Sequence, residues 1–345
     1  MAYEVTIGIP VYNVEKYVRR MMDSALAQTF SNIEFLVCDD CGTDGSMEII
    51  REYQQSHPRG KDIRIVRQPQ NGGLGRARNR IIEEASGVYL YHLDADDAIA
   101  PNTIELLYKN AIKYNAEIVY GSYERIEEFG SQTRRVAYQY PAMFFDKEDT
   151  FAMFAYSSYD RLQCNNWNYL IDIDILRRNN LRVQPVNYWE DLSFTLDLPT
   201  YITRAVLLPD ITYYYYCRLG SLSNFQKRKI IAKEEIVRTI QAVNQNKDNS
   251  DRIRQKPYFS GRMYKLMATD FYMACAILQK KDAISPSFSK REIRDIFKSP
   301  LTFGEILKFN KARKVILFIH IIGVLPPLIS VSLVKIVGRL KKIIK

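Results

Sequence analysis

The chain has 345 residues and a mass of 40.3 kDa, which is enough for two or three domains. Hydrophobic residues make up 47% and charged residues 26%, with 15 glycines and 13 prolines, which excludes a disordered, collagen-like or low-complexity chain. Of the five cysteines, Cys38 and Cys41 have C-x-x-C spacing, but no second pair or nearby histidine completes a zinc motif. This sparse set favours a reducing compartment such as the cytosol.

The net charge of +10 is unevenly distributed along the chain. Residues 1–220 carry 23 Lys/Arg and 30 Asp/Glu, or −7, whereas residues 221–345 carry 26 and 9, or +17. Such an asymmetry indicates a nucleic-acid or membrane-surface partner for the basic part. No cationic segment precedes the first apolar run, so we expect no signal peptide.

Alternating apolar runs and helix-period stretches predict an α/β fold over the first 125 residues. Runs rich in Val, Ile and Leu predict buried strands at Val5–Pro10, Ile33–Asp39, Ile63–Gln68 and Val88–Leu93. The stretches between them predict helices at Lys16–Ala27, Ser46–Gln55 and Arg76–Ala85, then a helix after Pro101 and a strand at Glu117–Glu128. This β-α-β-α order requires right-handed crossovers and therefore a mostly parallel sheet.

Beyond residue 130 the pattern is mixed and then helical. We expect a helix near Lys147–Ser157, a short helix that begins near Glu190, and a strand at Ile211–Arg218 that contains four consecutive tyrosines. Beyond residue 225 the chain is helical and basic. We therefore expect an α/β domain at 1–220, a basic helical region at 221–310 and an apolar, basic tail at 311–345.

The tail contains a long uncharged segment. Val315–Val334 has no Asp, Glu, Lys or Arg in 20 residues, which is long enough for one bilayer crossing. Pro326 and Pro327 interrupt it, and the basic flanks on both sides give no orientation. We expect a broken, shallowly inserted or re-entrant segment, with Lys341, Lys342 and Lys345 contacting anionic headgroups. A buried core helix, a dimer interface and a true span are the alternatives.

Polar clusters follow each of the four predicted parallel strands, and ligands gather at such carboxyl ends. The clusters are Pro10–Asn13, Cys38–Ser46, Asn71–Asn79 and Leu93–Asp97. They would lie along one edge of the sheet and form one site from four loops.

The carboxylates of Asp94, Asp96 and Asp97 lie within four residues at a strand end. They repel one another unless a cation relieves them. Hard cations such as Mg²⁺ or Mn²⁺ prefer carboxylate oxygens and leave positions open for substrate phosphates. An acidic turn that caps the following helix is the alternative interpretation.

The glycines Gly72, Gly73 and Gly75 follow the third strand rather than the first, so they do not form a dinucleotide-binding fingerprint. Arg76 and Arg78 would neutralise a diphosphate through charge-assisted hydrogen bonds, or else lie on a solvated helix face.

Glu190 and Asp191 open a helical stretch, where a carboxylate would act as a general base or would simply favour the helix start. The three histidines share no spacing, and we give them no role.

These motifs resemble the inverting glycosyltransferases of family 2, of the bacterial polysaccharide-biosynthesis type, which have the GT-A fold. The resemblance covers roughly residues 1–220. The matching pieces are Ile9-Pro-Val-Tyr-Asn13, Asp39-Asp40 with Thr43-Asp44-Gly-Ser46, Asn71-Gly-Gly with Ala77-Arg78-Asn79, Leu93-Asp94-Ala-Asp96-Asp97, and Trp189-Glu190-Asp191. Two departures are Cys41-Gly42 in place of Gly-Ser and the missing Lys-Leu-Tyr continuation near Trp167.

The resemblance implies a role for each matched residue. Pro10 and Tyr12 would line the nucleotide pocket, Asp39 and Asp40 would contact the base, Arg78 would lie near the base or diphosphate, and Asp94 would lie near the ribose. Asp96 or Asp97 would hold the metal, and Asp191 would be the catalytic base. Trp167, Glu190, Arg218 and Ser221 would lie on the acceptor or donor side.

The implied fold is a Rossmann-like GT-A domain followed by a basic helical region. The implied reaction moves a sugar from a nucleoside-diphosphate donor, expected to be a UDP-sugar, to an acceptor hydroxyl with inversion, aided by Mn²⁺ or Mg²⁺. The acceptor would be a glycan on a lipid carrier during cell-surface polysaccharide assembly. The protein would be peripheral or monotopic on the cytoplasmic side of the bacterial inner membrane.

Three other functions compete with this interpretation. A metal-dependent phosphate-ester hydrolase also needs clustered carboxylates, and a non-catalytic protein would bind the nucleotide-sugar without transfer. A nucleic-acid partner is not expected, because residues 1–220 are acidic. The sequence leaves the oligomeric state open.

Overall fold

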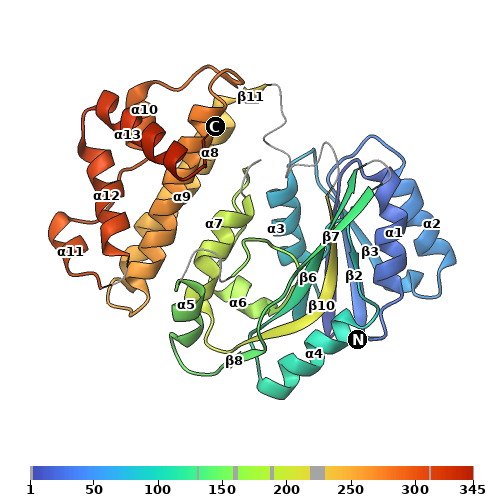
Figure 1. Ribbon diagram of the computed structural model, residues 1–345. Helices are drawn as coiled ribbons and strands as arrows, with labels where there is room; N and C mark the ends of the chain where they lie inside the picture. Colours follow the sequence, from blue (N-terminus) through green and yellow to red (C-terminus); the bar gives the residue numbers. More distant parts are fainter. Residues whose placement is uncertain are drawn as a thin grey trace. The chain divides into compact units, whose positions relative to one another are not determined.

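The computed structural model describes residues 3–129, 132–157, 162–186, 190–217, 230–310 and 312–344. The chain forms two compact units. An α/β unit comprises Met1–Phe151 and Cys164–Ser223, and a helical unit comprises Ala152–Gln163 and Asn224–Lys345 (Figure 1).

The first half of the α/β unit follows the predicted β-α order. The four strands are β1 (Val5–Val11), β2 (Ile33–Asp39), β3 (Ile63–Arg67) and β4 (Tyr89–His92). Their pairings with one another are all parallel. The helices between them are α1 (Glu15–Leu26), α2 (Ser46–Ser56) and α3 (Leu74–Glu84). Helices α1 and α2 cover one face of these strands and α3 the other (Figure 1). These predictions are confirmed, with boundaries that move by two residues at most.

The second half of the unit makes the sheet mixed. Its elements are β5 (Ala98–Ile99), α4 (Thr103–Tyr114), β6 (Ile118–Phe129), β7 (Gln132–Tyr138), β8 (Met143–Phe145), β9 (Tyr169–Asp172), α6 (Ile173–Arg178), α7 (Glu190–Asp197) and β10 (Ala205–Cys217). Helix α5 (Thr150–Ala155) begins in this unit and belongs to the helical unit from Ala152 onward. The strand order is β3-β2-β1-β4-β9-β6-β10-β5, and β9 runs antiparallel to both β4 and β6. The sheet is parallel over the four predicted strands but not throughout, because β9 enters between β4 and β6 from the opposite direction.

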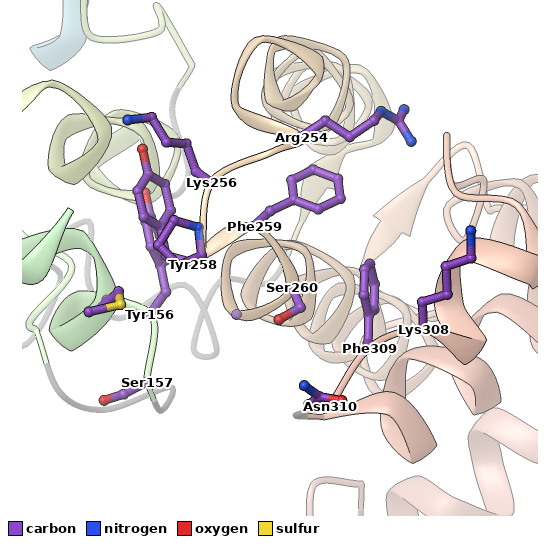
Figure 2. Close-up of a pocket in the computed structure, with 13 residues that line it drawn as sticks. Tyr156, Ser157, Arg254, Lys256, Tyr258, Phe259, Ser260, Lys308, Phe309 and Asn310 are labelled. Carbon is purple, nitrogen blue, oxygen red and sulfur yellow. The ribbon is translucent and has the colours of Figure 1, made fainter.

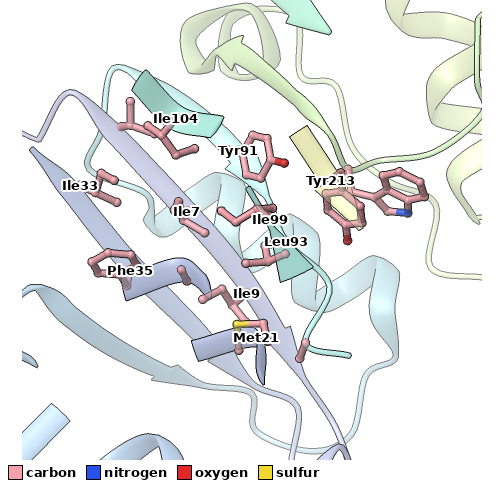
Figure 3. Packing of buried hydrophobic residues seen from close by; sticks show 14 of the residues in the cluster. Ile7, Ile9, Met21, Ile33, Phe35, Tyr91, Leu93, Ile99, Ile104 and Tyr213 are labelled. Carbon is pink, nitrogen blue, oxygen red and sulfur yellow. The ribbon is translucent and has the colours of Figure 1, made fainter. Parts of the chain in front are cut away.

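The core explains why the first strands are continuous apolar runs. Every residue of β1 and β2 is buried, as expected for strands covered on both faces. Ile7 and Ile9 of β1 pack near Phe35 of β2 and Leu93 after β4 (Figure 3). Strand order reverses at β1, with β2 on one side and β4 on the other. The carboxyl edge at this reversal is where an open α/β sheet forms a ligand crevice.

The helical unit is built around one long helix. It contains α8 (Lys233–Asp248), α9 (Phe259–Gln279), α10 (Lys290–Asp295), α11 (Phe303–Leu307), α12 (Arg313–Val324) and α13 (Pro327–Leu340), with the short strands β11 (Ile231–Ala232) and β12 (Ile284–Ser285). Helices α8, α12 and α13 pack on α9. Lys247 of α8 and Asp270 of α9 form an ion pair of 2.6 Å, and both side chains are 1% exposed. Some of the charge in this basic region is therefore structural.

The uncharged segment 315–334 folds as two helices that meet at Pro326 and Pro327, as the broken-segment prediction requires. One face of each helix is buried, with Ile316 and Ile319 on α12 and Val331 and Val334 on α13. Across the described parts of the chain, no helix has both the length and the apolar content that a membrane crossing requires. The alternative of a buried core helix therefore describes only one face of the segment, because the other face carries exposed apolar side chains.

Candidate active site at the carboxyl edge of the sheet

Two glycine-rich loop segments are held together by buried carboxylates after β2. Asp40 is 2% exposed, and its two carboxylate oxygens accept hydrogen bonds from the backbone N–H groups of Gly72 at 2.7 Å and Gly73 at 2.9 Å. Gly73 has a φ of 80°, which a residue with a side chain rarely adopts. Asp39 accepts from the Cys41 N–H at 2.9 Å and lies 3.4 Å from Arg67. These contacts fix the loop, and a role for Asp39 and Asp40 at a nucleotide base stays a prediction.

The other predicted nucleotide residues lie at the same edge. Pro10 is buried in β1 and pairs with Cys38 of β2, whereas Tyr12 follows β1 directly and is 48% exposed. The exposed Tyr12 ring beside the switch point is available to a ligand. Pro10 is part of the paired backbone of β1.

The three acidic residues after β4 have different environments. Asp97 is 1% exposed, and its oxygens accept hydrogen bonds from the Tyr213 hydroxyl at 2.7 Å and the Tyr216 N–H at 2.8 Å. Burial, together with the charges of Asp96 and Asp94, raises the pKa of Asp97 well above its usual value. Both oxygens of Asp97 thus bond to β10, and its role as a metal ligand stays a prediction.

Asp96 is half-buried and keeps its position through its backbone. Its carbonyl oxygen accepts a hydrogen bond of 2.6 Å from Arg20, whose guanidinium lies 3.4 Å from the centre of the Tyr216 ring. In the described residues, no group of three or more His, Cys, Asp or Glu side chains is arranged to hold a metal ion. Asp96 and Asp94 do fit a cation that takes one or two protein carboxylates and completes its shell with substrate phosphates.

A buried arginine joins three carboxylates at the centre of the site. Arg78 of α3 is 0% exposed. Its Nη1 donates to Asp191, its Nη2 donates to Asp94 at 2.8 Å, and Glu190 lies 3.5 Å from Nη1. Arg78 therefore does not lie on a solvated helix face. It links α3, the loop after β4 and the start of α7, which are far apart in the sequence.

The cluster holds more negative than positive charge. Burial raises the pKa of Glu190 to about 8, and the neighbouring Asp191 adds to this rise while Arg78 opposes it. Burial also raises the pKa of Asp191, against the opposing charge of Arg78 and a hydrogen bond from the Asn166 backbone. Three carboxylates thus surround one guanidinium, and burial raises the pKa of both Glu190 and Asp191 while Arg78 opposes the rise.

The remaining predicted residues are less informative. Trp167 is 7% exposed and stacks on Tyr213 and Tyr215, with ring centroids 4.3 Å and 5.3 Å apart. Its acceptor-side role stays a prediction. Arg218 and Ser221 lie outside the described residues.

Sequence reasoning missed several residues that complete the site. Tyr213 had a signal, the run of four tyrosines, but its hydroxyl contact with Asp97 depends on tertiary pairing. Arg20 looked like an ordinary helix cation, and Asn166 followed no motif. His92 is buried, and burial together with Arg78 lowers its pKa to about 3, so it is neutral.

The chain is similar to known glycosyltransferases in sequence. The model of glycosyl transferase family 2 matches residues 6–173. The chondroitin synthase of Pasteurella multocida is 39% identical over 109 residues, which is 32% of this chain and 11% of that protein. The chain spans less than half the length of the first curated relatives that it matches.

Several solved structures share the fold. Staphylococcus aureus TarS 1–349 in complex with UDP-GlcNAc has a TM-score of 0.70 at 16% identity, over 99% of this chain and 92% of that one. The mannosyltransferase PcManGT of Pyrobaculum calidifontis, in complex with GDP-Man and Mn²⁺, has a TM-score of 0.52 at 16% identity, over 96% and 87%. The expected GT-A fold, with a helical C-terminal region, is therefore confirmed.

Proposed function

Because residues 6–173 match the model of glycosyl transferase family 2, we propose that the protein transfers a sugar from a UDP-sugar to a hydroxyl group of a glycan, with inversion at the anomeric carbon. The observation that carries the proposal is the Arg78 cluster, which holds Asp191 and Asp94 on one guanidinium at the switch point. The proposed base and the proposed donor-side carboxylate thus contact the same guanidinium. The family assignment does not favour the phosphate-ester hydrolase or the non-catalytic protein.

The proposed reaction uses Asp191 as the base. Its carboxylate takes the proton of the acceptor hydroxyl, whose oxygen attacks the anomeric carbon from the face opposite the diphosphate, so the configuration inverts. A raised pKa suits this task, since a base works best when its pKa lies near the working pH. A divalent cation held by Asp96 and Asp94 would supply charge neutralisation for the leaving diphosphate.

A panel of nucleotide-sugars tests the reaction and the donor together. With Mn²⁺ present, we expect one UDP-sugar to give the fastest release of nucleoside diphosphate, with inverted configuration in the product. EDTA should lower the rate about 100-fold or more, because a metal supplies several kcal/mol to the transition state, and added Mn²⁺ should restore it. Full activity in EDTA would contradict the proposed metal dependence. Release of inorganic phosphate in place of nucleoside diphosphate would contradict sugar transfer.

We further propose that the helical unit binds the cytoplasmic leaflet, near a lipid-linked acceptor. On and after α12, the side chains of Val324, Leu328 and Leu340 are 69%, 60% and 76% exposed. No Asp or Glu follows Glu305 in the chain, while nine Lys or Arg residues do. Exposed apolar side chains beside cations are typical of a surface that inserts shallowly into anionic lipid.

Substitution of exposed residues tests membrane binding without emptying the core. The double variant Val324→Ser/Leu328→Ser should weaken sedimentation with anionic vesicles about tenfold or more, because each apolar side chain contributes up to about 1.5–3 kcal/mol when buried. Ile112→Ser is the matched control, since Ile112 is 57% exposed on α4 of the other unit. Vesicle binding by the double variant equal to that of the unaltered chain would refute the proposal.

A further inference from the structure

The helical unit contains a cavity that the proposed reaction does not use. Its volume is about 390 Å³, within the range of small-molecule sites. Three segments distant in sequence line it: the end of α5, the turn that leads into α9, and residues 308–310 after α11. All of its lining residues belong to the helical unit, whereas the Arg78 cluster belongs to the α/β unit.

Four aromatic rings line the cavity, and three of them are buried. Tyr156 and Tyr258 stack with centroids 5.7 Å apart, and Phe259 meets Phe309 edge to face at 6.0 Å. Tyr156, Tyr258 and Phe259 are 3%, 4% and 5% exposed. In Figure 2 the two tyrosines lie on one side and Phe309 on the other, with Ser260 between them. Because these rings are packed, the cavity exists without any movement of the chain.

The lining is cationic. Arg254, Lys256 and Lys308 are among the 13 lining residues, and none of the 13 is Asp or Glu. Arg254 is held from outside the lining by Asp251 at 2.5 Å and by Glu305. Those two carboxylates orient the guanidinium, which lies 5.6 Å from the Phe259 ring centre. Lys308 is exposed at the cavity and adds a further positive charge.

We propose that this cavity binds an anionic saccharide unit, one that carries a phosphate or a carboxylate. Lysines would take the anionic group by charge-assisted hydrogen bonds, while the Ser260 hydroxyl and the Asn310 amide would bond sugar hydroxyls against the half-buried Phe309 ring. A cavity with aromatic, hydroxyl and amide groups suits a saccharide better than a lipid headgroup, for which exposed lysines suffice. As the source of the ligand we take the acceptor glycan, and only this step rests on the proposed function.

Calorimetry on the full chain with UDP and Mn²⁺ present tests the proposal. The probes are a glucuronate-containing tetrasaccharide for the carboxylate, glucose 6-phosphate for the phosphate, and maltotetraose as the neutral control. We expect one or both anionic probes to bind and maltotetraose to bind at least tenfold more weakly. Lys308→Glu should weaken binding of the anionic probe at least tenfold. Lys256→Gln should also weaken that binding. Lys290→Glu, an exposed position at the start of α10, is the matched control.

Several results would overturn this site. If maltotetraose bound as tightly as the anionic probes, the site would not require an anionic group. If Lys308→Glu bound the anionic probe as tightly as the unaltered chain does, the ligand would bind elsewhere. Loss of anionic-vesicle binding in Lys308→Glu, with no saccharide bound by the unaltered chain, would assign the cations to lipid. Because saccharide binding is measured without transfer, its failure is separate from a failure of the nucleotide-sugar panel.

Discussion

Asp191→Asn should lower turnover by about 10²–10⁴-fold while UDP binding is largely kept. Asparagine has the same shape but accepts no proton from the acceptor hydroxyl. Because the variant also removes one of three carboxylates around Arg78, we expect the fold to be kept and the thermal midpoint to change little. Rates of nucleoside-diphosphate release, UDP affinity and thermal unfolding together measure these effects.

Two controls sharpen the assignment of the base. Asp210→Asn changes an exposed carboxylate of β10 and should leave the rate unchanged. Glu190→Gln changes the neighbouring acid, whose raised pKa favours the protonated form, so it should reduce the rate less than Asp191→Asn does. A large loss in Glu190→Gln together with near-normal transfer in Asp191→Asn would move the base to Glu190.

Arg78→Gln should damage both stability and transfer. It leaves three carboxylates in a buried cluster without their cation, and removing one partner of a buried pair costs about 3–5 kcal/mol. For a unit of this size the thermal midpoint should fall roughly 6–20 °C at neutral pH. Turnover should fall about 100-fold or more, since Asp191 loses the group that orients it.

The pH dependence of this variant has a definite sign. Loss of the cation favours the protonated carboxyl groups, so their pKa values rise further and activity requires a higher pH. Acid protonates the crowded carboxylates and removes their repulsion, so the stability difference from the unaltered chain should shrink as pH falls.

Arg80→Gln is the matched control for Arg78→Gln. Arg80 lies on the same helix, is 43% exposed and pairs only with Glu84 among the described ion pairs. If Arg78 acts through Asp191, the double variant Arg78→Gln/Asp191→Asn should lose little more turnover than Asp191→Asn alone. Additive losses in turnover would show that Arg78 acts independently of the base.

The sequence predicted the elements well where one strong pattern dominated. Buried parallel strands require continuous apolar runs, so β1 to β4 and their helices were identifiable from hydrophobicity alone. Strand β9 was not predicted, since four residues between irregular segments carry little periodicity. Its antiparallel entry is decided by pairing with β4 and β6, which local sequence does not encode.

The candidate site was predicted as a set of residues but not as a set of contacts. Spacing placed Asp94, Asp96 and Asp97 in one loop, yet it did not distinguish the carboxylate that turns inward to Tyr213 from those that stay near the rim. Likewise, Arg78 was expected near a diphosphate, whereas its contacts depend on α7 arriving from more than a hundred residues away. Such assignments require three-dimensional pairing.

The Asp40 contacts limit how the leaving group of the proposed reaction would be stabilised. In phosphate-binding glycine loops, backbone amides wrap the phosphate. Here the amides of Gly72 and Gly73 already donate to a carboxylate from the neighbouring strand. This loop consequently presents no vacant amide pair to a departing diphosphate at those two residues. In the proposed reaction, counter-charge for the leaving group would therefore come from a cation or from side chains rather than from these two amides, and the rate would then depend on the metal supply.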